Sequence, residues 1–522
     1  MDLSENTTSL QGLEAEIERV KAAIQSLREK QRHLQSLRNL KLPFFHLPPE
    51  ICVTIFSFAC HKGRLPNDQN QEVVTTPFTI SGVCRAWREL AHSAPELWSS
   101  ASLCVGSIRS TRSMVQAELF RRWLHLAKTL PLSISITFDE RVASDTWKPS
   151  GRQTAISVAA YYSHQWESVD LTLPSDLLLS IGCRPFPNLQ SLSLKIPRQN
   201  SIAPLPIFLD APKLRAANLD CANIDVGLPY HQLEELTLHG YDIAPCLSLL
   251  DKSSNLTFCR IVKVLEPIGF HWGRPAEDIS HRLTKPVHLL KLVSLETTDS
   301  EPFKLLACIK APALRSIAIP LRDVHQMKAL STFLTRSNAM LQRLTIIDHI
   351  PEEEDFLKML DTLPHLSHLE INEVRTLGSR RFGFRSDSPL VWLGPSQKFF
   401  DYLTTPDATL DNLPLPALTS FKYHGPINFK SDNRQTEQWD DKYQFDIDSL
   451  EKMLVSRWNA NISFNHSTSQ LQSFIMSIQE SPHKAVAHLE QSPVVQKLRK
   501  EGMHLVFELA EERPKRPSSF YI

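Results

Sequence analysis

Residues 42–103 decide how this chain is organised, through three short runs: Leu47-Pro48-Pro49-Glu50-Ile51, Ile80-Ser81-Gly82-Val83-Cys84-Arg85-Ala86-Trp87 and Pro95-Glu96-Leu97-Trp98. A proline in the first turn of a helix costs no hydrogen bond, because its missing N–H would have no partner there. We therefore expect a helix to begin at Pro48 or Pro49. Apolar side chains then recur with helical spacing at Ile51, Cys52, Ile55, Phe56 and Ala59.

The second run has the spacing of a single amphipathic helix, which Thr79 or Ser81 could cap. Its apolar positions are Ile80, Val83, Cys84, Trp87, Leu90 and Ala91. Two or three helices of this size bury little apolar surface against one another, so we expect them to need a partner surface. The alternative is a small helical hairpin that packs only on its own chain.

The order of these positions resembles the F-box, and more narrowly the F-box-like domain of a large family of fungal proteins. The resemblance covers residues 42–105 and rests on Leu-Pro-x-Glu-Ile-x-x-x-Ile-Phe, Val-Cys-Arg-x-Trp-Arg-x-Leu-Ala and Pro-x-Leu-Trp. The segment from His61 to Phe78 makes the connection longer than usual. In that family the F-box packs on the Skp-type adaptor of cullin–RING ubiquitin ligases. The resemblance implies that Trp87 contributes most to an adaptor contact made by Leu47, Pro48, Ile51, Ile55, Val83, Cys84 and Trp87.

Residues 1–41 precede this domain and have the pattern of a coiled-coil helix. Within residues 9–40 the apolar positions alternate steps of three and four, and the polar Gln31 fills one core position. The positions are Leu10, Leu13, Ile17, Val20, Ile24, Leu27 and Leu34. We expect a homodimer through residues 9–40, the alternative being a helix that folds back on the globular part.

Residues 106–512 contain a recurring Leu-x-x-Leu-x-Leu template, and most copies begin 19 to 27 residues apart. Turn residues, often including a proline, precede the better copies, as expected where a strand begins. The copies start at Trp166, Leu189, Leu214, Leu233, Leu256, Leu292, Leu314, Leu341, Leu366 and Leu418. The chain here resembles an irregular leucine-rich-repeat α/β solenoid, the alternative being an ordinary α/β domain with leucine-rich strands. We expect residues 513–522 to be a disordered tail.

The residues between and just after the leucines of each strand face away from the core, because side chains alternate along a strand. They form a polar row of mixed charge, which suits a protein target better than a lipid or a nucleic acid. The alternative is a merely solvated sheet face. The row consists of Ser191, Ser193, Lys195, Asn218, Asp220, Glu235, Thr237, His239, Arg260, Arg343, Thr345, His368, Glu370 and Asn372.

Composition points to a globular protein, with 42% hydrophobic and 22% charged residues. Lysine plus arginine equals aspartate plus glutamate at 57 each, so we expect neither nucleic acid nor membrane as a partner. The nine cysteines lack paired spacing and predict reduced thiols in a cytoplasmic or nuclear protein. The N-terminal Met-Asp-Leu-Ser-Glu lacks the apolar segment of a secretory signal, and no apolar run approaches the ~18 residues of a membrane span.

The sequence contains no nucleotide-binding loop, nucleophile elbow or zinc-protease motif, so we expect no enzyme, cofactor or metal. Glu352–Asp355 superficially resembles a cation site, but the acidic first turn of a helix is the simpler interpretation. The function expected is a substrate-recognition subunit of a Skp–cullin–F-box type ubiquitin ligase, whose F-box binds the adaptor and whose repeats bind the target. The alternative is a non-ligase protein-interaction scaffold that uses the coiled coil and the solenoid.

Overall fold

The computed structural model describes residues 3–60, 76–105, 110–138, 150–197, 204–221, 224–265, 286–298, 302–321, 323–347, 353–373, 395–404, 414–426, 447–463, 469–479 and 483–509. The chain divides into two compact units, the first made of residues 1–189 with 210–212, the second of residues 190–209 with 213–522. The expected tail at 513–522 and most of the long connection at 61–78 lie outside the described residues.

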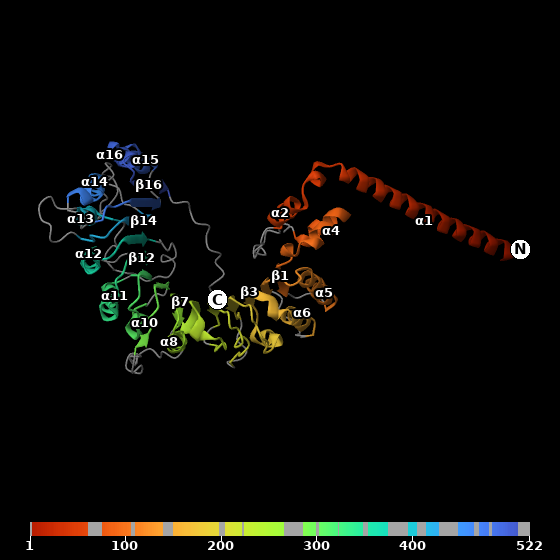
Figure 1. The fold of residues 1–522 in the computed structure, drawn as a ribbon, viewed down its shortest axis with the longest axis horizontal. Coiled ribbons are helices and arrows are strands. Elements are labelled where there is room, and N and C mark those ends of the chain that lie inside the picture. Colours follow the sequence, from red (N-terminus) through yellow and green to blue (C-terminus); the bar gives the residue numbers. More distant parts are fainter. Residues whose placement is uncertain are drawn as a thin grey trace. The chain divides into compact units, whose positions relative to one another are not determined.

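The described residues at the start of the first unit are mainly helical, and Figure 1 labels α1, α2 and α4 among them. The bounds of these elements are α1 Leu3–Leu40, η1 Pro43–His46, α2 Pro49–Ala59, α3 Pro77–Val83, α4 Arg85–Ser93 and η2 Pro95–Leu97. Pro48 is the N-cap of α2 and Pro49 its first residue, which confirms the predicted helix start.

The single helix predicted over residues 80–91 is wrong, because α3 ends at Val83 and α4 begins at Arg85. Cys84 between them is extended, with φ −156°, and its Sγ accepts the Trp87 N–H at 3.4 Å. The Arg88 Nε donates to the Ser81 carbonyl at 3.0 Å, satisfying an oxygen that the break leaves without a helical partner. The helical spacing of apolar residues continues across the break at Cys84, so the sequence pattern alone does not show that the helix is interrupted.

The rest of the first unit alternates parallel strands with helices. Its elements are β1 Ser100–Val105, α5 Ser110–Leu126, β2 Leu132–Phe138, α6 Ser150–Tyr161, η4 Ser163–Gln165, β3 Trp166–Thr172, α7 Ser175–Leu178 and η5 Leu179–Ile181. β1 pairs with β2, and β2 with β3, all in parallel. Residues 100–105, which the sequence places in the helical domain, therefore form a strand, with Ala101, Leu103 and Val105 buried.

The second unit is a mixed α/β arrangement in which parallel strands follow one another in sequence order. The strands are β4 Ser191–Lys195, β5 Ala216–Asp220, β6 Glu235–Asp242, β7 Phe258–Leu265, β9 Ser294–Thr297, β11 Ser316–Pro320, β12 Arg343–Ile347, β13 His368–Asn372, β14 Ser420–Pro426, β15 Ser473–Gln479 and β16 His504–Leu509, with the small pair β8 Val287–His288 and β10 Ile309–Lys310. This sheet is the solenoid-like part of the chain.

From β6 onward, helices return the chain between most successive strands of the second unit, and the short turn η6 stands between β5 and β6. They are η6 Tyr230–Gln232, α8 Ile243–Lys252, α10 Pro302–Cys308, α11 Val324–Ser337, α12 Glu353–Asp361, α13 Gln397–Leu403, α14 Ile447–Ser463, α15 His483–Gln491 and α16 Pro493–Lys500. Figure 1 shows α8, α10, α11 and α12 in a row along one side of the sheet, and among the described residues these four helices all lie on that side of the strands.

The leucine template places the core correctly. Leu192, Ala217, Leu236 and Cys259 stand side by side in the register of β4 to β7, and all are buried. The same ladder continues through Leu295, Ile317, Leu344, Leu369 and Phe421. Every strand predicted from the template is present, and the predicted parallel α/β arrangement is confirmed.

A buried arginine holds the C-terminal part of the second unit together. Arg457 in α14 has no exposed surface, and its guanidinium donates to the carbonyl oxygens of Leu403 at 2.5 Å, Pro414 at 2.6 Å and Leu415 at 3.2 Å. Burial lowers the pKa of Arg457 to about 10, so the group stays charged near neutral pH. Leu415 has a positive φ of 48°, a conformation that costs a non-glycine residue about 1–2 kcal/mol. Arg457 therefore stabilises the strained turn at Leu415, although the two residues are 42 positions apart in the sequence.

Candidate functional site

The helical segment of the first unit turns one apolar face of α2 toward solvent. Ile51 is 49% and Ile55 41% exposed, while Cys52 and Phe56 on the opposite face are buried. Leu47, just before the helix, and Val83, at the end of α3, are also exposed. We call Leu47, Ile51, Ile55 and Val83 the aliphatic stripe. Exposed branched aliphatic side chains at helical spacing are typical of a surface that another molecule covers.

The predicted adaptor residues Trp87 and Cys84 have structural contacts within this segment. The Trp87 ring is half-buried, with its centroid 4.8 Å from that of Phe44 and 4.9 Å from that of Phe56. Cys84 caps α4 through its sulfur. Pro48 lies exposed at the N-cap of α2. Trp87 thus anchors the face of α2 that lies opposite to the isoleucines, and its role in an adaptor contact stays a prediction.

A second aromatic cluster fixes α3 and η2 against α5. Trp98 is fully buried and donates its Nε1 proton to the Ala91 carbonyl at 2.7 Å. The Trp123 ring of α5 meets Trp98 edge-on at 5.6 Å, and the Phe78 ring lies 5.1 Å from Trp98 and 5.4 Å from Trp123. These rings give the small helical segment the core that its own helices are too short to provide.

In the second unit, the polar residues predicted to bind the target line up on one sheet face. The register places Ser193, Asn218, Thr237 and Arg260 in one row across four strands, and Arg343 beside His368 in another. The predicted row members are exposed or half-buried: Ser191, Ser193, Lys195, Asn218, Asp220, Glu235, Thr237, His239, Arg260, Arg343, Thr345, His368, Glu370 and Asn372. We call this set the polar sheet face.

Several charges of the polar sheet face are paired between neighbouring strands. Lys195 lies 3.0 Å from the carboxylate of Asp220, and the Nε of Arg260 donates to Glu296 at 2.6 Å. Glu370 contacts Lys422 at 3.3 Å. Sequence reasoning missed Glu296 and Lys422, although both stand at the outward position of their strands. A partner on this face therefore meets ion pairs as well as single charges.

Two histidines of the polar sheet face have a lowered pKa. Burial is the main cause for His239, and the nearby Lys195 and Arg260 add to it while Asp220 opposes it. Burial lowers the pKa of His368 as well, with a further contribution from Arg343. Both imidazoles are consequently neutral near pH 7, so this face presents them as hydrogen-bonding groups and not as cations.

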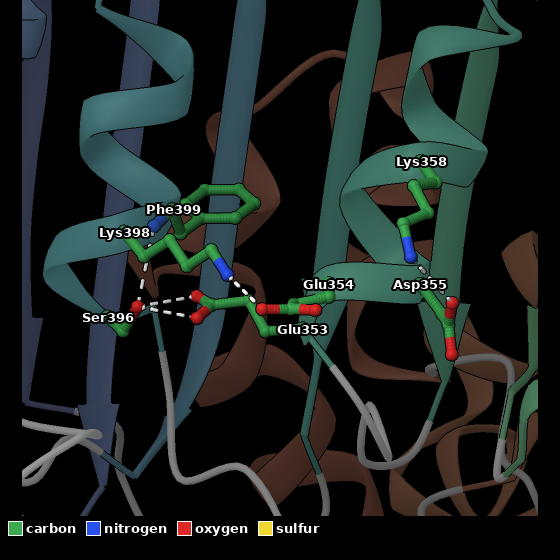
Figure 2. Close-up of polar contacts among 7 residues, drawn as sticks. All are labelled: Glu353, Glu354, Asp355, Lys358, Ser396, Lys398 and Phe399. Atoms are coloured by element: carbon green, nitrogen blue, oxygen red, sulfur yellow. Dashed lines mark hydrogen bonds and ion pairs between the residues drawn. The ribbon is translucent and has the colours of Figure 1, made fainter.

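Three of the acidic residues considered as a cation site, Glu353, Glu354 and Asp355, form the first turn of α12, as the simpler interpretation predicts. The fourth, Glu352, lies outside the described residues. Figure 2 shows Glu353 turned toward Ser396, which donates to both carboxylate oxygens at 2.6 and 2.7 Å, and Glu354 toward Lys398 at 2.5 Å. Asp355 is turned the other way and contacts Lys358 at 3.4 Å. These carboxylates join α12 to α13. Among the described residues, no three His, Cys, Asp or Glu side chains are grouped to hold a metal.

The N-terminal helix α1 exposes the apolar positions of its heptad pattern. The exposed residues are Leu13, Ile17, Val20, Ile24, Leu27 and Leu34. Ion pairs within the helix join Arg19 to Glu16 at 3.1 Å and Lys21 to Glu18 at 2.7 Å. That a second copy of α1 covers these heptad positions stays a prediction.

Comparison with known proteins assigns the chain to no family. A scan against protein-family models finds no match, and a search of curated proteins finds none either. None of the helices in the described ranges combines the length and the apolar content needed to cross a membrane.

Proposed function

We propose that this chain is the substrate-recognition subunit of a Skp–cullin–F-box type ubiquitin ligase, with the helical segment 42–105 as an F-box-like adaptor-binding domain. The observation that carries the proposal is the aliphatic stripe, since Leu47, Ile51, Ile55 and Val83 all belong to the adaptor-binding set that the F-box resemblance implies. The chemistry of ubiquitin transfer would belong to other subunits, and this chain would supply proximity and orientation.

The energetics support a partner surface here. Fully burying an exposed Leu, Ile or Val contributes about 1.5–3 kcal/mol, and these four side chains already lose part of that area in the free chain. Covering them would contribute about 3–6 kcal/mol in total. That gain alone is smaller than the free energy of a micromolar affinity, and association also costs translational and rotational freedom, so further contacts around the stripe would have to contribute.

The repeat region would bind the target protein. We propose that the second unit is an irregular leucine-rich-repeat-like solenoid whose polar sheet face captures the target. This proposal is supported by the register of the strands, because the outward residues of successive strands stand side by side and form a continuous surface. Short polar side chains of mixed charge suit recognition by hydrogen bonds and matched charges.

The second candidate is a non-ligase scaffold that dimerises through residues 9–40. The exposed heptad positions of α1 favour self-association, since isoleucine at the positions of Ile17 and Ile24 with leucine at that of Leu27 is typical of parallel two-stranded coiled coils. Sedimentation of the full chain and of a shortened chain that begins at Lys41 decides this point. We expect the full chain to be dimeric and the shortened chain monomeric, and equal monomeric masses would mean that α1 does not self-associate.

Affinity purification of the tagged chain from its own cells tests the proposed function. A ligase subunit should retain the adaptor and the cullin, and Leu47→Ala with Pro48→Ala should remove both while the purified variant keeps its melting temperature. Retention of neither partner by the native chain would favour the scaffold. Retention of both by the double variant would contradict the adaptor contact.

A further inference from the structure

Beside the aliphatic stripe, the first unit contains a hollow that the proposed function does not use. It lies between α3, α4 and α5 and has a volume of about 620 Å³, within the range of about 300–1,000 Å³ that binding pockets show. Its lining comprises Phe78, Ser81, Gly82, Arg88, His92, Leu119, Arg121, Arg122, His125 and Leu126. None of the aliphatic stripe residues belongs to this lining.

The two walls of the hollow carry basic groups. Arg88 and His92 stand one turn apart on α4, and Arg121 and His125 one turn apart on α5. Among the lining residues that the structure describes, none is an acid. Both Arg121 and Arg122 donate to the carboxylate of Glu118, at 2.8 and 3.0 Å, and these hydrogen bonds lower the pKa of Glu118 to about 2. The single negative charge of Glu118 is shared by the two positively charged guanidinium groups of Arg121 and Arg122. The hollow therefore has a net positive charge at this wall.

The lining also has an apolar part, Phe78 and Leu119, which we call the floor of the hollow. Phe78 belongs to the cluster with the buried Trp98 and Trp123, which fixes its ring. Leu119, which follows Glu118 on α5 and stands one turn before Arg122, is 44% exposed. A floor of this kind holds an apolar side chain, and the walls hold groups of negative charge on either side of it.

We propose that this hollow is a docking site for an acidic peptide segment of a partner protein, with an apolar side chain on Phe78 and Leu119 and carboxylates facing Arg88 and Arg122. A nucleic acid fits less well, because its phosphates follow one another along a basic stripe, whereas here three arginines surround an apolar floor. The inference is independent of adaptor binding, since the stripe and the hollow share no residue.

Fluorescence anisotropy on the full chain tests the site. The probe is a labelled peptide of sequence Glu-Glu-Leu-Glu-Glu-Leu-Glu, and the comparison probes are the same peptide with Gln in place of each Glu and a single-stranded deca-thymidylate. We expect saturable binding of the acidic peptide that weakens when sodium chloride is raised from 50 to 300 mM, because exposed charges are screened. The glutamine peptide and the DNA should bind at least about tenfold more weakly.

Matched variants locate the binding. Arg88→Gln with Arg122→Gln should weaken the acidic peptide about tenfold, and Leu119→Gln about fourfold. Arg85→Gln, on α4 but outside the lining, and the exposed Leu179→Gln should leave the affinity unchanged. If the double variant lowers the melting temperature, Leu119→Gln alone decides, since that side chain is partly exposed.

Several outcomes overturn the proposal. They are no saturation by 1 mM acidic peptide, equal binding of the glutamine peptide, tighter binding of the DNA, and a loss with Arg85→Gln as large as with the pocket variants. Ile51→Gln with Ile55→Gln should abolish adaptor binding and spare the acidic peptide. Failure of one site is therefore distinguishable from failure of the other.

Discussion

The helical segment of the first unit exposes to solvent the same kind of side chain that the sheet of the second unit buries. Ile51 and Ile55 in α2 are exposed, whereas Ile317 and Ile319 in β11 are completely buried. In the sheet, β11 lies between β9 and β12, and helices α10 and α11 precede and follow it. In the helical segment, Trp87 packs on Phe56 of α2, and among the described residues nothing covers the face that carries Ile51 and Ile55. Regular apolar spacing therefore indicates a face that packs against another surface. Whether that surface belongs to the same chain depends on the neighbouring elements of the fold.

The largest loss of stability should come from substituting a buried residue of the second unit. Arg457→Met should lower the free energy of unfolding of the second unit by about 3–5 kcal/mol, because three carbonyl groups lose their donor. Arg343→Met, at an exposed position of the same unit, should change it by less than about 0.5 kcal/mol. Urea unfolding measures both. Equal losses would mean that Arg457 does not hold the turn around Leu415.

Within the helical segment, the two faces of α2 should respond differently to truncation. Trp87→Ala should destabilise the segment by about 3 kcal/mol, because the ring packs against both Phe44 and Phe56. Ile51→Ala should cost less than about 1 kcal/mol, because half of that side chain is already exposed. Thermal unfolding followed by tryptophan fluorescence compares the two. A larger loss with Ile51→Ala would show that α2 packs the other way round.

A smaller effect on stability is expected on the polar sheet face. Glu235→Lys with Arg343→Glu should abolish target capture and leave the folding free energy within about 0.5 kcal/mol. Arg260→Glu is a less specific test, because it also places two carboxylates together by breaking the pair with Glu296. Capture is measured with the tagged chain in its own cells, and adaptor binding serves as the control. Capture that survives the double change would place the target elsewhere.

The smallest effect is a dependence of stability on pH. Because burial lowers the pKa of His239 and His368, the unfolded chain takes up protons first as pH falls. Stability should therefore decrease below the ordinary histidine pKa of about 6.5, by less than about 1 kcal/mol for each partly exposed group. Urea unfolding at pH 7.5 and 5.5 should show a smaller decrease for His239→Gln than for the native chain. An equal decrease in both would exclude a contribution from His239.

The strands of the second unit could be predicted because their signal is local. Each copy of the template carries its own buried leucines, and parallel neighbours repeat the same spacing. β15 follows the same rule with Leu471, Phe474 and Met476, but it went unpredicted because aromatic and methionine residues replace the leucines. β1 went unpredicted because serines and a cysteine separate its few apolar residues.

Features that depend on distant partners could not be predicted. The role of Arg457 requires carbonyl groups that lie 42 to 54 residues away in the chain. The basic hollow joins α4 to α5, and neither helix alone differs from an ordinary charged surface helix. The exposure of Ile51 and Ile55 likewise follows from where Trp87 packs. The helical spacing of the apolar residues in α2 was thus predictable, whereas their division between core and surface was not.

Calorimetric titration of the purified Skp-type adaptor into the full chain measures the proposed adaptor contact with no other subunit present. The native chain should bind with a dissociation constant of about 1 μM or tighter, and Ile51→Gln with Ile55→Gln should weaken binding at least about thirtyfold without lowering the melting temperature. Equal affinity of the native chain and the folded double variant, or no binding of the native chain at 100 μM adaptor, would contradict the account.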